Sequence, residues 1–440
     1  MQQTQPQAGR AGRPRIYHGW LIVACSFITN AVVFGAGTAS FSVFMTPMTQ
    51  ALGWSRATFT GAVTLQSLLN LIVAPISGMI VDRFGPRLVM VFGACVATVC
   101  YMILGHITEP WQFYIVYAGA VSLGLHEMGS LITSVVVSKW FIRKRGRALA
   151  FMATGNNVGS IVFAPFSAYL IDTLGWQAAW AVLGLCIAVL VLPPTIAIMR
   201  RTPEDMGLLP DGDLPATAAV SATDRGTPPP PRRTEVDWTL REALHTPALW
   251  LMVVSTNLSA LAFASSIHLV PYFQDIGLPL QTATFVFALN HISGFTSKLV
   301  WGFIAEHVPV RYCLMGNYLG RALGLIILVF GGGVWRAYGY AVISGILSNA
   351  FPSLQPQAWA DYYGRAFLGT IRGVLTPFSL MASIGGPLFA AFVFDKAGSY
   401  DLAFNVFTVT LIIAAVVLYF APPPKKPVKA PPEQPQSVAA

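Results

Sequence analysis

Long apolar runs separated by short polar segments extend along almost the whole chain. Each run is close to or longer than the ~20 residues that an α-helix needs to cross a hydrocarbon core about 30 Å thick. The runs cover residues 18–46, 58–81, 88–107, 111–138, 147–174, 178–198, 247–273, 281–305, 311–330, 334–358, 369–394 and 402–420. This pattern predicts an all-α integral membrane protein with twelve transmembrane helices.

The composition supports this fold class, and the distribution of charge orients it. Of the 440 residues, 55% are hydrophobic and 10% are charged, with a mean hydropathy of +0.61. A soluble domain does not keep its charge so low, because its surface faces water. Most of the 27 Lys and Arg residues fall in the tails and in the loops on the same side as the tails, and such basic segments face the cytoplasm. We therefore expect a multi-pass protein of the cell inner membrane with both termini in the cytoplasm, and no nucleic-acid binding.

The longest polar stretch, residues 200–246, separates the runs into six and six. It contains the proline run Pro228–Pro231 and scattered charges without apolar periodicity, which is typical of a linker. Near its end, Asp237 is placed to cap a short interfacial helix before the seventh run. The expected organisation is a cytoplasmic tail at 1–17, a six-helix bundle at 18–199, a cytoplasmic linker at 200–246, a second six-helix bundle at 247–421 and a cytoplasmic tail at 422–440.

The two sets of six runs repeat each other at an offset of about 224 residues. The matching positions are Pro47, Gly53, Gly78, Asp82, Asp172 and Gly175 in the first set and Pro271, Gly277, Gly302, Glu306, Asp395 and Gly398 in the second. Parallel repeats of this kind are related by an axis along the membrane normal, and cargo binds near the midplane between them. The repeat predicts two pseudo-symmetric six-helix bundles with a path between them.

The loop between the second and third runs, residues 78–87, reads Gly-Met-Ile-Val-Asp-Arg-Phe-Gly-Pro-Arg. Gly85 permits a tight turn, and the carboxylate of Asp82 can favour a nearby helix N-terminus. Arg83 and Arg87 can anchor the loop to the anionic inner leaflet. The loop resembles the signature loop of the major facilitator superfamily, which implies a latch between the halves formed by Gly78 and these four residues. The alternative is an ordinary basic turn, because cytoplasmic loops are basic in any case.

Other stretches resemble the monocarboxylate and oxalate–formate carriers within that superfamily. They are Tyr17-His18-Gly19-Trp20, Lys139-Trp140-Phe141 followed by Arg143-Lys144-Arg145, Gly155-Asn156-Asn157-Val158-Gly159, and Gly385-Gly386-Pro387 leading to Asp395. The resemblance covers the whole chain in pieces. It implies the major facilitator fold and transport of a small organic anion by alternating access.

One cation lies near the middle of the eighth run. Lys298 shares a helical face with His291, and Asn290 lies at the edge of that face. A charge in the middle of a membrane-spanning helix marks a functional site by default. In the resembling carriers an arginine at this position pairs with the substrate carboxylate, which implies an anion site with the point charge of a lysine. The alternative is that Lys298, about 12 Å of helix rise from Glu306, extends to the inner interface. Phe351, in the tenth run, is a candidate apolar wall of the substrate cavity.

A polar seam in the fourth run offers the opposite side of the path. It consists of four residues spaced three or four apart, Glu127, Ser130, Ser134 and Ser138. Glu127 is open to three interpretations: a carboxyl group that loads and releases a proton, a counter-ion to Lys298 in one state, or a hydrogen-bonded structural acid. His126 and His291 are further candidates for proton coupling because histidine titrates near neutral pH. A lone histidine in a helix bundle also serves as a packing residue.

The chain departs from the animal monocarboxylate carriers at two positions that bear on proton coupling in that family. Those carriers place an aspartate one turn before the arginine of the eighth helix, where this chain has Gly294. They also place a lysine in the first helix, where this chain reads Gly-Ala-Gly-Thr-Ala-Ser-Phe at residues 35–41. Proton symport, exchange and uniport therefore all stay open.

The sequence indicates neither an enzyme nor a cofactor or metal site. It contains no Gly-x-x-x-x-Gly-Lys-Ser/Thr nucleotide motif, and its five cysteines lack metal-ligand or disulfide spacing. We expect a monomeric secondary active transporter of a small organic anion, a monocarboxylate such as lactate or pyruvate, with Lys298 binding the carboxylate. The alternatives are uptake or efflux of a larger aromatic or heterocyclic compound, organic-anion exchange, and a non-transporting membrane sensor.

Overall fold

The regular structure of the described chain is entirely helical. The computed structural model describes residues 17–213, 235–263 and 265–426, and every regular element within these ranges is a helix. Most of the two expected tails, and the part of the expected linker that contains Pro228–Pro231, lie outside the described residues. The all-α prediction is confirmed for the rest.

Six membrane-length segments form the first half of the structure. They are α1 (His18–Val32) continuing through the π-helical η1 (Val33–Ala39) into α2 (Ser40–Leu52); α3 (Arg56–Phe84); α4 (Pro86–Leu104); α5 (Pro110–Phe113) with η2 (Tyr114–Val121), α6 (Ser122–Met128) and α7 (Ser130–Trp140); and two segments within α8 (Arg145–Ile198). The two segments of α8 meet at Gly175, whose φ of 81° is not helical. Glycine adopts this conformation without the steric cost of a Cβ, so the expected fifth and sixth spans turn there.

The second half repeats this order. Its segments are α11 (Pro247–Phe263) followed by α12 (Ser265–Asp275); α13 (Leu280–His307); α14 (Val310–Phe330); α15 (Trp335–Ser348) with α16 (Phe351–Tyr363); α17 (Leu368–Ala397); and α18 (Asp401–Tyr419). Among the described residues, eight helices are long and apolar enough by themselves to cross a membrane. Large apolar side chains on the outer faces, such as Ile161 at 68% and Ile72 at 65% exposure, are suited to contact with lipid.

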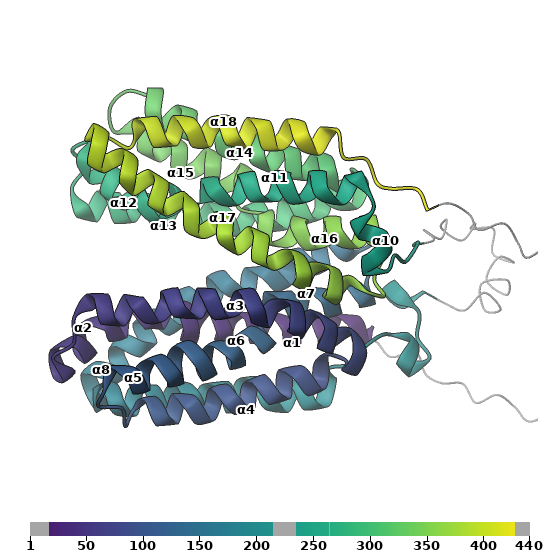
Figure 1. The fold of residues 1–440 in the computed structure, drawn as a ribbon, viewed down its shortest axis with the longest axis horizontal. Coiled ribbons are helices and arrows are strands. Elements are labelled where there is room, and N and C mark those ends of the chain that lie inside the picture. The colour runs from purple at the N-terminus through teal and green to yellow at the C-terminus, as the bar shows by residue number, and fades with distance from the viewer. Residues whose placement is uncertain (1–16, 214–234, 264, 427–440) are drawn as a thin grey trace, which may run out of the picture.

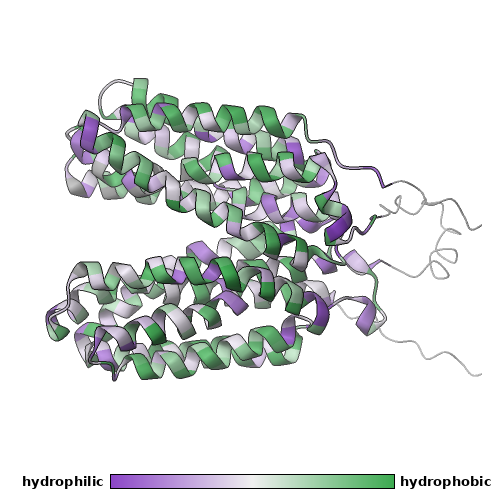
Figure 2. Ribbon diagram, in the orientation of Figure 1, coloured by the Kyte–Doolittle hydropathy of each residue, from purple (hydrophilic) through white to green (hydrophobic). Residues whose placement is uncertain are grey.

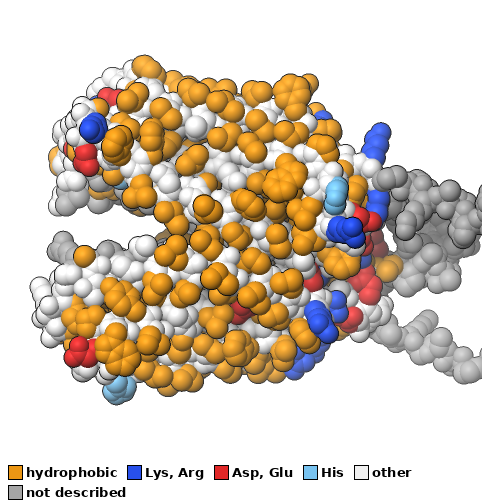
Figure 3. All heavy atoms as spheres, viewed as in Figure 1, with side chains coloured by type: hydrophobic (Ala, Val, Ile, Leu, Met, Phe, Trp, Pro, Cys, Tyr) orange, Lys and Arg blue, Asp and Glu red, His pale blue; other side chains and the backbone are white. Residues whose placement is uncertain are grey.

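The two halves lie side by side as separate bundles (Figure 1). They meet at one end of the molecule, which we call the linker end because residues 200–213 and 235–246 lie there. Figure 3 shows a deep notch between the halves at the opposite end, which we call the open end. Hydrophilic residues gather at the linker end, whereas the helices between the two ends are largely hydrophobic (Figure 2).

The most extensive contacts between the halves are made by two pairs of helices, α3 with α17 and α8 with α13. Glycines make the approach close in both pairs, because they have no Cβ to hold the backbones apart. Gly78 on α3 faces the backbone of Gly369 and Gly373 on α17. A Cβ added to Gly302 on α13 would lie 2.5 Å from the Cβ of Ala150 and 2.8 Å from the carbonyl oxygen of Gly146, both on α8. The closed linker end therefore depends on backbone-to-backbone packing.

The short helix before the seventh span forms, but Asp237 does not cap it, so this prediction is wrong. The helix α10 (Leu240–Leu244) begins after Thr239, whose hydroxyl accepts a hydrogen bond from the amide of Glu242 at 3.3 Å. The carboxylate of Glu242 accepts in turn from the amide of Thr239 at 2.9 Å, which completes a capping box. Asp237 is two residues too early for this role and binds another segment, described below.

Candidate functional site

Lys298 lies between the two halves. Its side chain extends from α13 to α8, where the ammonium nitrogen donates to the carbonyl oxygen of Ala153 at 3.1 Å and to Oδ1 of Asn157 at 2.6 Å. The residue is 5% exposed. The ammonium group is therefore held at the interface between α8 and α13, and it does not extend to the linker end in this conformation.

A second cation, Arg372, lies across the same division between the halves. It is located on α17, and its Nη1 donates to the hydroxyl of Ser134 on α7. Arg372 lines a cavity of about 270 Å³ together with Phe351, Gln355 and Leu131. The sequence analysis missed this residue because it lies only four positions inside the expected eleventh span, where an arginine resembles an interfacial anchor. The signal that could have found it is the phase of the helix, which turns Arg372 toward the other half.

Neither cation has an acidic partner among the described residues. The ion pairs of the described chain include neither Lys298 nor Arg372. Both are satisfied by neutral acceptors from the first half, a backbone carbonyl, a side-chain amide and a hydroxyl. Lys298 is buried and Arg372 is half-buried, so each keeps a positive charge that its neutral partners do not balance. An anion placed at this interface would neutralise that charge.

The other candidate substrate-binding residues differ in where they point. Phe351 lies beside the cavity of Arg372, and its ring centroid is 6.3 Å from that of Tyr318. Asn290 is buried within the second half, where its amide donates to the carbonyl of Ala341 at 3.2 Å. His291 is exposed, and its ring packs edge-on against Phe287 with the centroids 4.6 Å apart. The structure thus groups Phe351 with Arg372, whereas Asn290 packs helices of its own half together.

The expected single seam along the fourth span does not exist, because the helix is broken at Gly129. The backbone there is extended, with φ −72° and ψ −175°, and it separates α6 from α7. The polar side chains on the two sides of the break consequently have different partners. Glu127, before the break, accepts from α3, whereas Ser130 and Ser134, after it, bind α1 and α17. A break at this depth is tolerated in membrane proteins where the chain is buried in protein or lines a cavity.

Glu127 lies at the end of α6, directly before the break. It is 6% exposed, and its Oε1 accepts a hydrogen bond from the hydroxyl of Ser77 on α3. Its Oε2 is buried and has no hydrogen-bond partner, and the same holds for Nε2 of the neighbouring His126. Glu127 forms no ion pair with Lys298 in this conformation. Only one of the two carboxylate oxygens thus has a hydrogen-bond partner. Keeping a permanent negative charge on such a group costs free energy inside a membrane protein.

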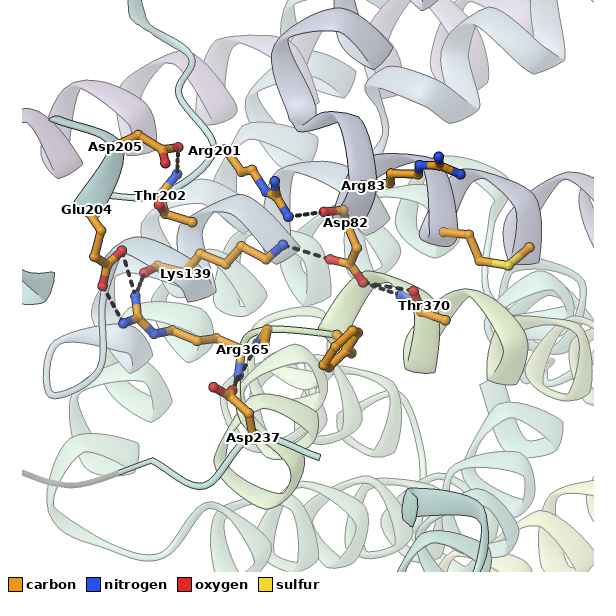
Figure 4. A pocket seen from close by; sticks show the side chains of 13 residues that line it. Asp82, Arg83, Lys139, Arg201, Thr202, Glu204, Asp205, Asp237, Arg365 and Thr370 are labelled. Atoms are coloured by element: carbon orange, nitrogen blue, oxygen red, sulfur yellow. Dashed lines mark hydrogen bonds and ion pairs between the residues drawn. The ribbon is translucent and has the colours of Figure 1, made fainter. Parts of the chain in front are cut away.

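Asp82 connects the signature loop to the second half (Figure 4). One carboxylate oxygen accepts from Nζ of Lys139 at 2.7 Å, and the other accepts from the amide of Thr370 at 2.7 Å and from its hydroxyl at 3.0 Å. Thr370 is in the first turn of α17, where the helix dipole favours a negative charge. Gly85 has a φ of 84° and turns the chain sharply into α4. Arg83 points away from Asp82 in Figure 4, and both it and Arg87 are exposed.

The repeat produces a matching contact in the second half. Glu306, which the offset pairs with Asp82, accepts from Arg147 at the start of α8. The distances are 2.7 Å to Nε, 2.7 Å to Nη2 and 3.3 Å to the backbone amide. Each acidic residue therefore binds the first turn of a helix that belongs to the opposite half. The linker end is closed by two equivalent contacts, one on each side of the pseudo-symmetry axis.

The linker adds a second pair of equivalent contacts at this end. The carboxylate of Asp211 accepts from the backbone amides of residues 142, 143 and 144 at 3.1, 2.9 and 3.0 Å. The carboxylate of Asp237 accepts from the amides of Arg365 and Ala366 at 2.9 and 3.0 Å. These are the turns before α8 and before α17, which the repeat relates to each other. The two ends of the linker thus bind corresponding turns of the two halves.

Glu235, also in the linker, joins the two halves directly. Its Oε1 lies 2.5 Å from Nη2 of Arg145 and its Oε2 lies 3.5 Å from Nε of Arg365. Arg145 also pairs with Asp361 at 2.7 Å. Burial raises the pKa of Glu235, although the two guanidinium groups act in the opposite direction. Desolvation therefore offsets part of the attraction between Glu235 and the two guanidinium groups.

Comparison with known sequences identifies the relatives of this chain. The sequence matches the description of the Major Facilitator Superfamily in two overlapping stretches, residues 27–375 and 292–440. The oxalate:formate antiporter of Oxalobacter formigenes is 25% identical over 98% of this chain and 99% of the relative. Monocarboxylate transporter 13 of Rattus norvegicus is 24% identical over 92% of this chain and 89% of the relative. The resemblance read from the motifs is thereby confirmed.

Solved structures give the same answer for the fold. The transporter FucP in its outward conformation superposes with a TM-score of 0.65 at 14% identity, over 92% of this chain and 100% of FucP. The proton:xylose symporter XylE, bound to a halogenated glucose, superposes with a TM-score of 0.71 at 12% identity, over 92% of this chain and 96% of XylE. At such low identity the likeness concerns the fold alone. With two repeated six-helix bundles, the signature loop and a family match over most of its length, the chain belongs to the major facilitator superfamily.

Proposed function

We propose that this transporter moves a small carboxylate across the membrane by alternating access between the two halves. The observation that carries the proposal is the ammonium group of Lys298, buried between α8 and α13 with only neutral acceptors. A carboxylate supplies the charge that this position lacks, and a hydrogen bond between ionised groups is about twice as strong as a neutral one. Arg372 supplies a second cation on the same side of the path. The names of the relatives, an oxalate:formate antiporter and a monocarboxylate transporter, agree with this substrate class.

The space beside Arg372 agrees with a small anion. Its volume is about 270 Å³, at the lower end of the roughly 300 to 1,000 Å³ of sites for drug-sized ligands. Phe351 provides an apolar wall for a short carbon chain. Monocarboxylates remain the proposed substrates, and the two cations extend the proposal to the smallest dicarboxylates.

The linker end is proposed to face the cytoplasm. Lys and Arg side chains gather there in Figure 3, as expected for segments on the cytoplasmic side of an inner membrane. Both chain ends would then lie in the cytoplasm, and the notch at the open end would face outward. The described conformation is in this view the outward-facing state of a monomeric carrier, ready to accept an anion from outside.

Flux measurements test the proposal directly. In liposomes that contain the purified protein, we expect saturable uptake of labelled formate, lactate or oxalate, with competition that weakens as the carboxylate grows. An imposed proton gradient separates symport from exchange, because exchange requires a preloaded anion and no gradient. Uptake of neutral or heterocyclic compounds, with no competition by any carboxylate, would contradict the anion assignment.

Glu127 is the proposed coupling group if uptake proves to be proton-driven. Its unpartnered, buried Oε2 can carry a proton without losing an existing hydrogen bond. We expect Glu127→Gln to abolish accumulation driven by a proton gradient, since the amide cannot bind the proton. Exchange against a preloaded anion should continue at a rate within about threefold of the wild-type rate. Ser77→Ala, which removes the hydrogen-bond donor but keeps the carboxyl group, is the matched control. Unchanged gradient-driven uptake by the glutamine variant would identify Glu127 as a structural acid.

A further inference from the structure

Contacts between α8 and α13 begin at the linker end and continue toward the open end, and their kind changes along the way. The facing residues, in order from that end, are Gly146, Ala150, Ala153 and Asn157 on α8 and Glu306, Gly302, Lys298 and His291 on α13. Their spacing of three, four or seven residues keeps each set on one face of its helix. The first contacts are an ion pair and close backbone packing. The last are the hydrogen bonds of Lys298 and Asn157, on the side toward the open end.

Asn157 uses both ends of its amide on α13. Its Oδ1 accepts from the ammonium group of Lys298 at 2.6 Å, and its Nδ2 donates to the carbonyl oxygen of His291 at 3.4 Å. The orientation of the amide is determined by chemistry, because an ammonium group can only donate and must therefore face the oxygen. Asn157 thus joins the first half to the second at the residue that is proposed to bind the substrate.

We propose that Asn157 is a positioning residue that holds Lys298 in the empty, closed-linker-end state and releases it to the incoming carboxylate. This inference rests on the proposed function. A substrate carboxylate is a stronger acceptor for the ammonium group than a neutral amide, so the exchange of partners is favourable. Once Lys298 has turned to the substrate, α8 and α13 lose both hydrogen bonds of its ammonium group and keep only the weaker one from Asn157 to the carbonyl of His291 at this depth. Substrate binding thereby weakens the interface that must open at the linker end.

The neutrality of Asn157 is essential to this role. An aspartate at the same position would provide a permanent carboxylate next to Lys298 and would compete with any anionic substrate. An alanine would leave Ala153 as the remaining acceptor from the opposite half, and the closed state would lose the contact without any substrate. The two substitutions therefore change the conformational equilibrium in opposite directions, which a purely structural residue would not do.

The experiment combines transport with a distance measurement. Spin labels are attached at positions 144 and 308, which lie at the linker end before α8 and after α13, in a variant whose five native cysteines are replaced. For Asn157→Asp we expect KM for the best carboxylate to rise about tenfold or more, while the distance distribution no longer responds to that carboxylate. For Asn157→Ala we expect a larger open population at the linker end without substrate. The adjacent Asn156→Asp is the matched control and should behave as the wild type.

The outcomes separate this inference from the proposed function. Wild-type KM and a wild-type response in Asn157→Asp, or an unchanged closed population in Asn157→Ala, would each overturn the role of Asn157. If Asn156→Asp produces the same changes as Asn157→Asp, the effect is one of general charge in this region and the inference also fails. The distance measurement on Asn157→Ala needs no substrate, so it still reports on Asn157 if the cargo proves not to be a carboxylate. Wild-type carboxylate uptake by Lys298→Ala, which removes the cation, would instead contradict the proposed function.

Discussion

Replacing Lys298 with alanine is expected to reduce carboxylate uptake about 100-fold, because a hydrogen bond to a charged group contributes roughly 1.5–3 kcal/mol and each 1.4 kcal/mol is a factor of ten. The amount of folded protein in the membrane should not fall, since the substitution removes a buried charge that has only neutral partners. Initial rates of uptake into liposomes, with the protein content measured in the same preparation, provide the comparison.

Two further variants make the result of this experiment specific. Lys396→Ala removes an exposed lysine from the same half and should leave uptake unchanged. Lys298→Arg retains the charge and should preserve part of the activity, although the planar guanidinium has a different geometry. Wild-type uptake by Lys298→Ala would remove the basis of the anion site, whereas the conclusions on the fold and on the contacts at the linker end would be unaffected.

Replacing Arg372 with glutamine is expected to lower uptake about 10- to 100-fold, with a larger effect on dicarboxylates than on monocarboxylates. Arg372 lines the cavity that also contains Phe351, and among the described residues no acidic group neutralises it. We propose that an anion with two carboxylates engages both Arg372 and Lys298, whereas an anion with one carboxylate engages only one of them. The measured quantity is the ratio of kcat/KM for oxalate to that for formate.

Ser134→Ala is the matched control for Arg372. It removes the hydroxyl that accepts from the guanidinium group but leaves the cation in place, so uptake should stay within about threefold of the wild-type value. An unchanged substrate ratio in Arg372→Gln would show that Arg372 serves the packing of α17 against α7 and not the recognition of the anion.

The fold could be predicted from the sequence because its signals are periodic and long. Apolar runs of membrane length predicted the spans, and the offset between the halves predicted which residues correspond. The contacts at the linker end show that corresponding residues make equivalent contacts: Asp82 binds the start of α17, and Glu306 binds the start of α8. Both are acidic residues four positions after a glycine, so the pattern alone indicated their equivalence. It did not indicate that each one reaches into the opposite half.

The site was predicted less completely because it depends on the phase and continuity of single helices. No proline near Gly129 indicates the break in the sequence, and isolated glycines are common within membrane helices. Arg372 lies near the end of a span, where position alone cannot distinguish a cation that faces the other half from one at the membrane interface. Asn157 is one of two adjacent asparagines, and only the packing of α8 against α13 shows which of them faces Lys298.

The sequence by itself determined the class of the protein, its division into two repeated halves, the signature loop and the position of Lys298 within a span. These features follow from composition and periodicity, which act along the chain. The tertiary structure alone decided which residues meet across the two halves: the partners of Lys298, the place of Arg372 beside Phe351, and the binding of the linker to equivalent turns. The physical reason is that burial and hydrogen bonding between the halves depend on how the helices pack against each other, and that packing is decided by contacts between segments far apart in the chain.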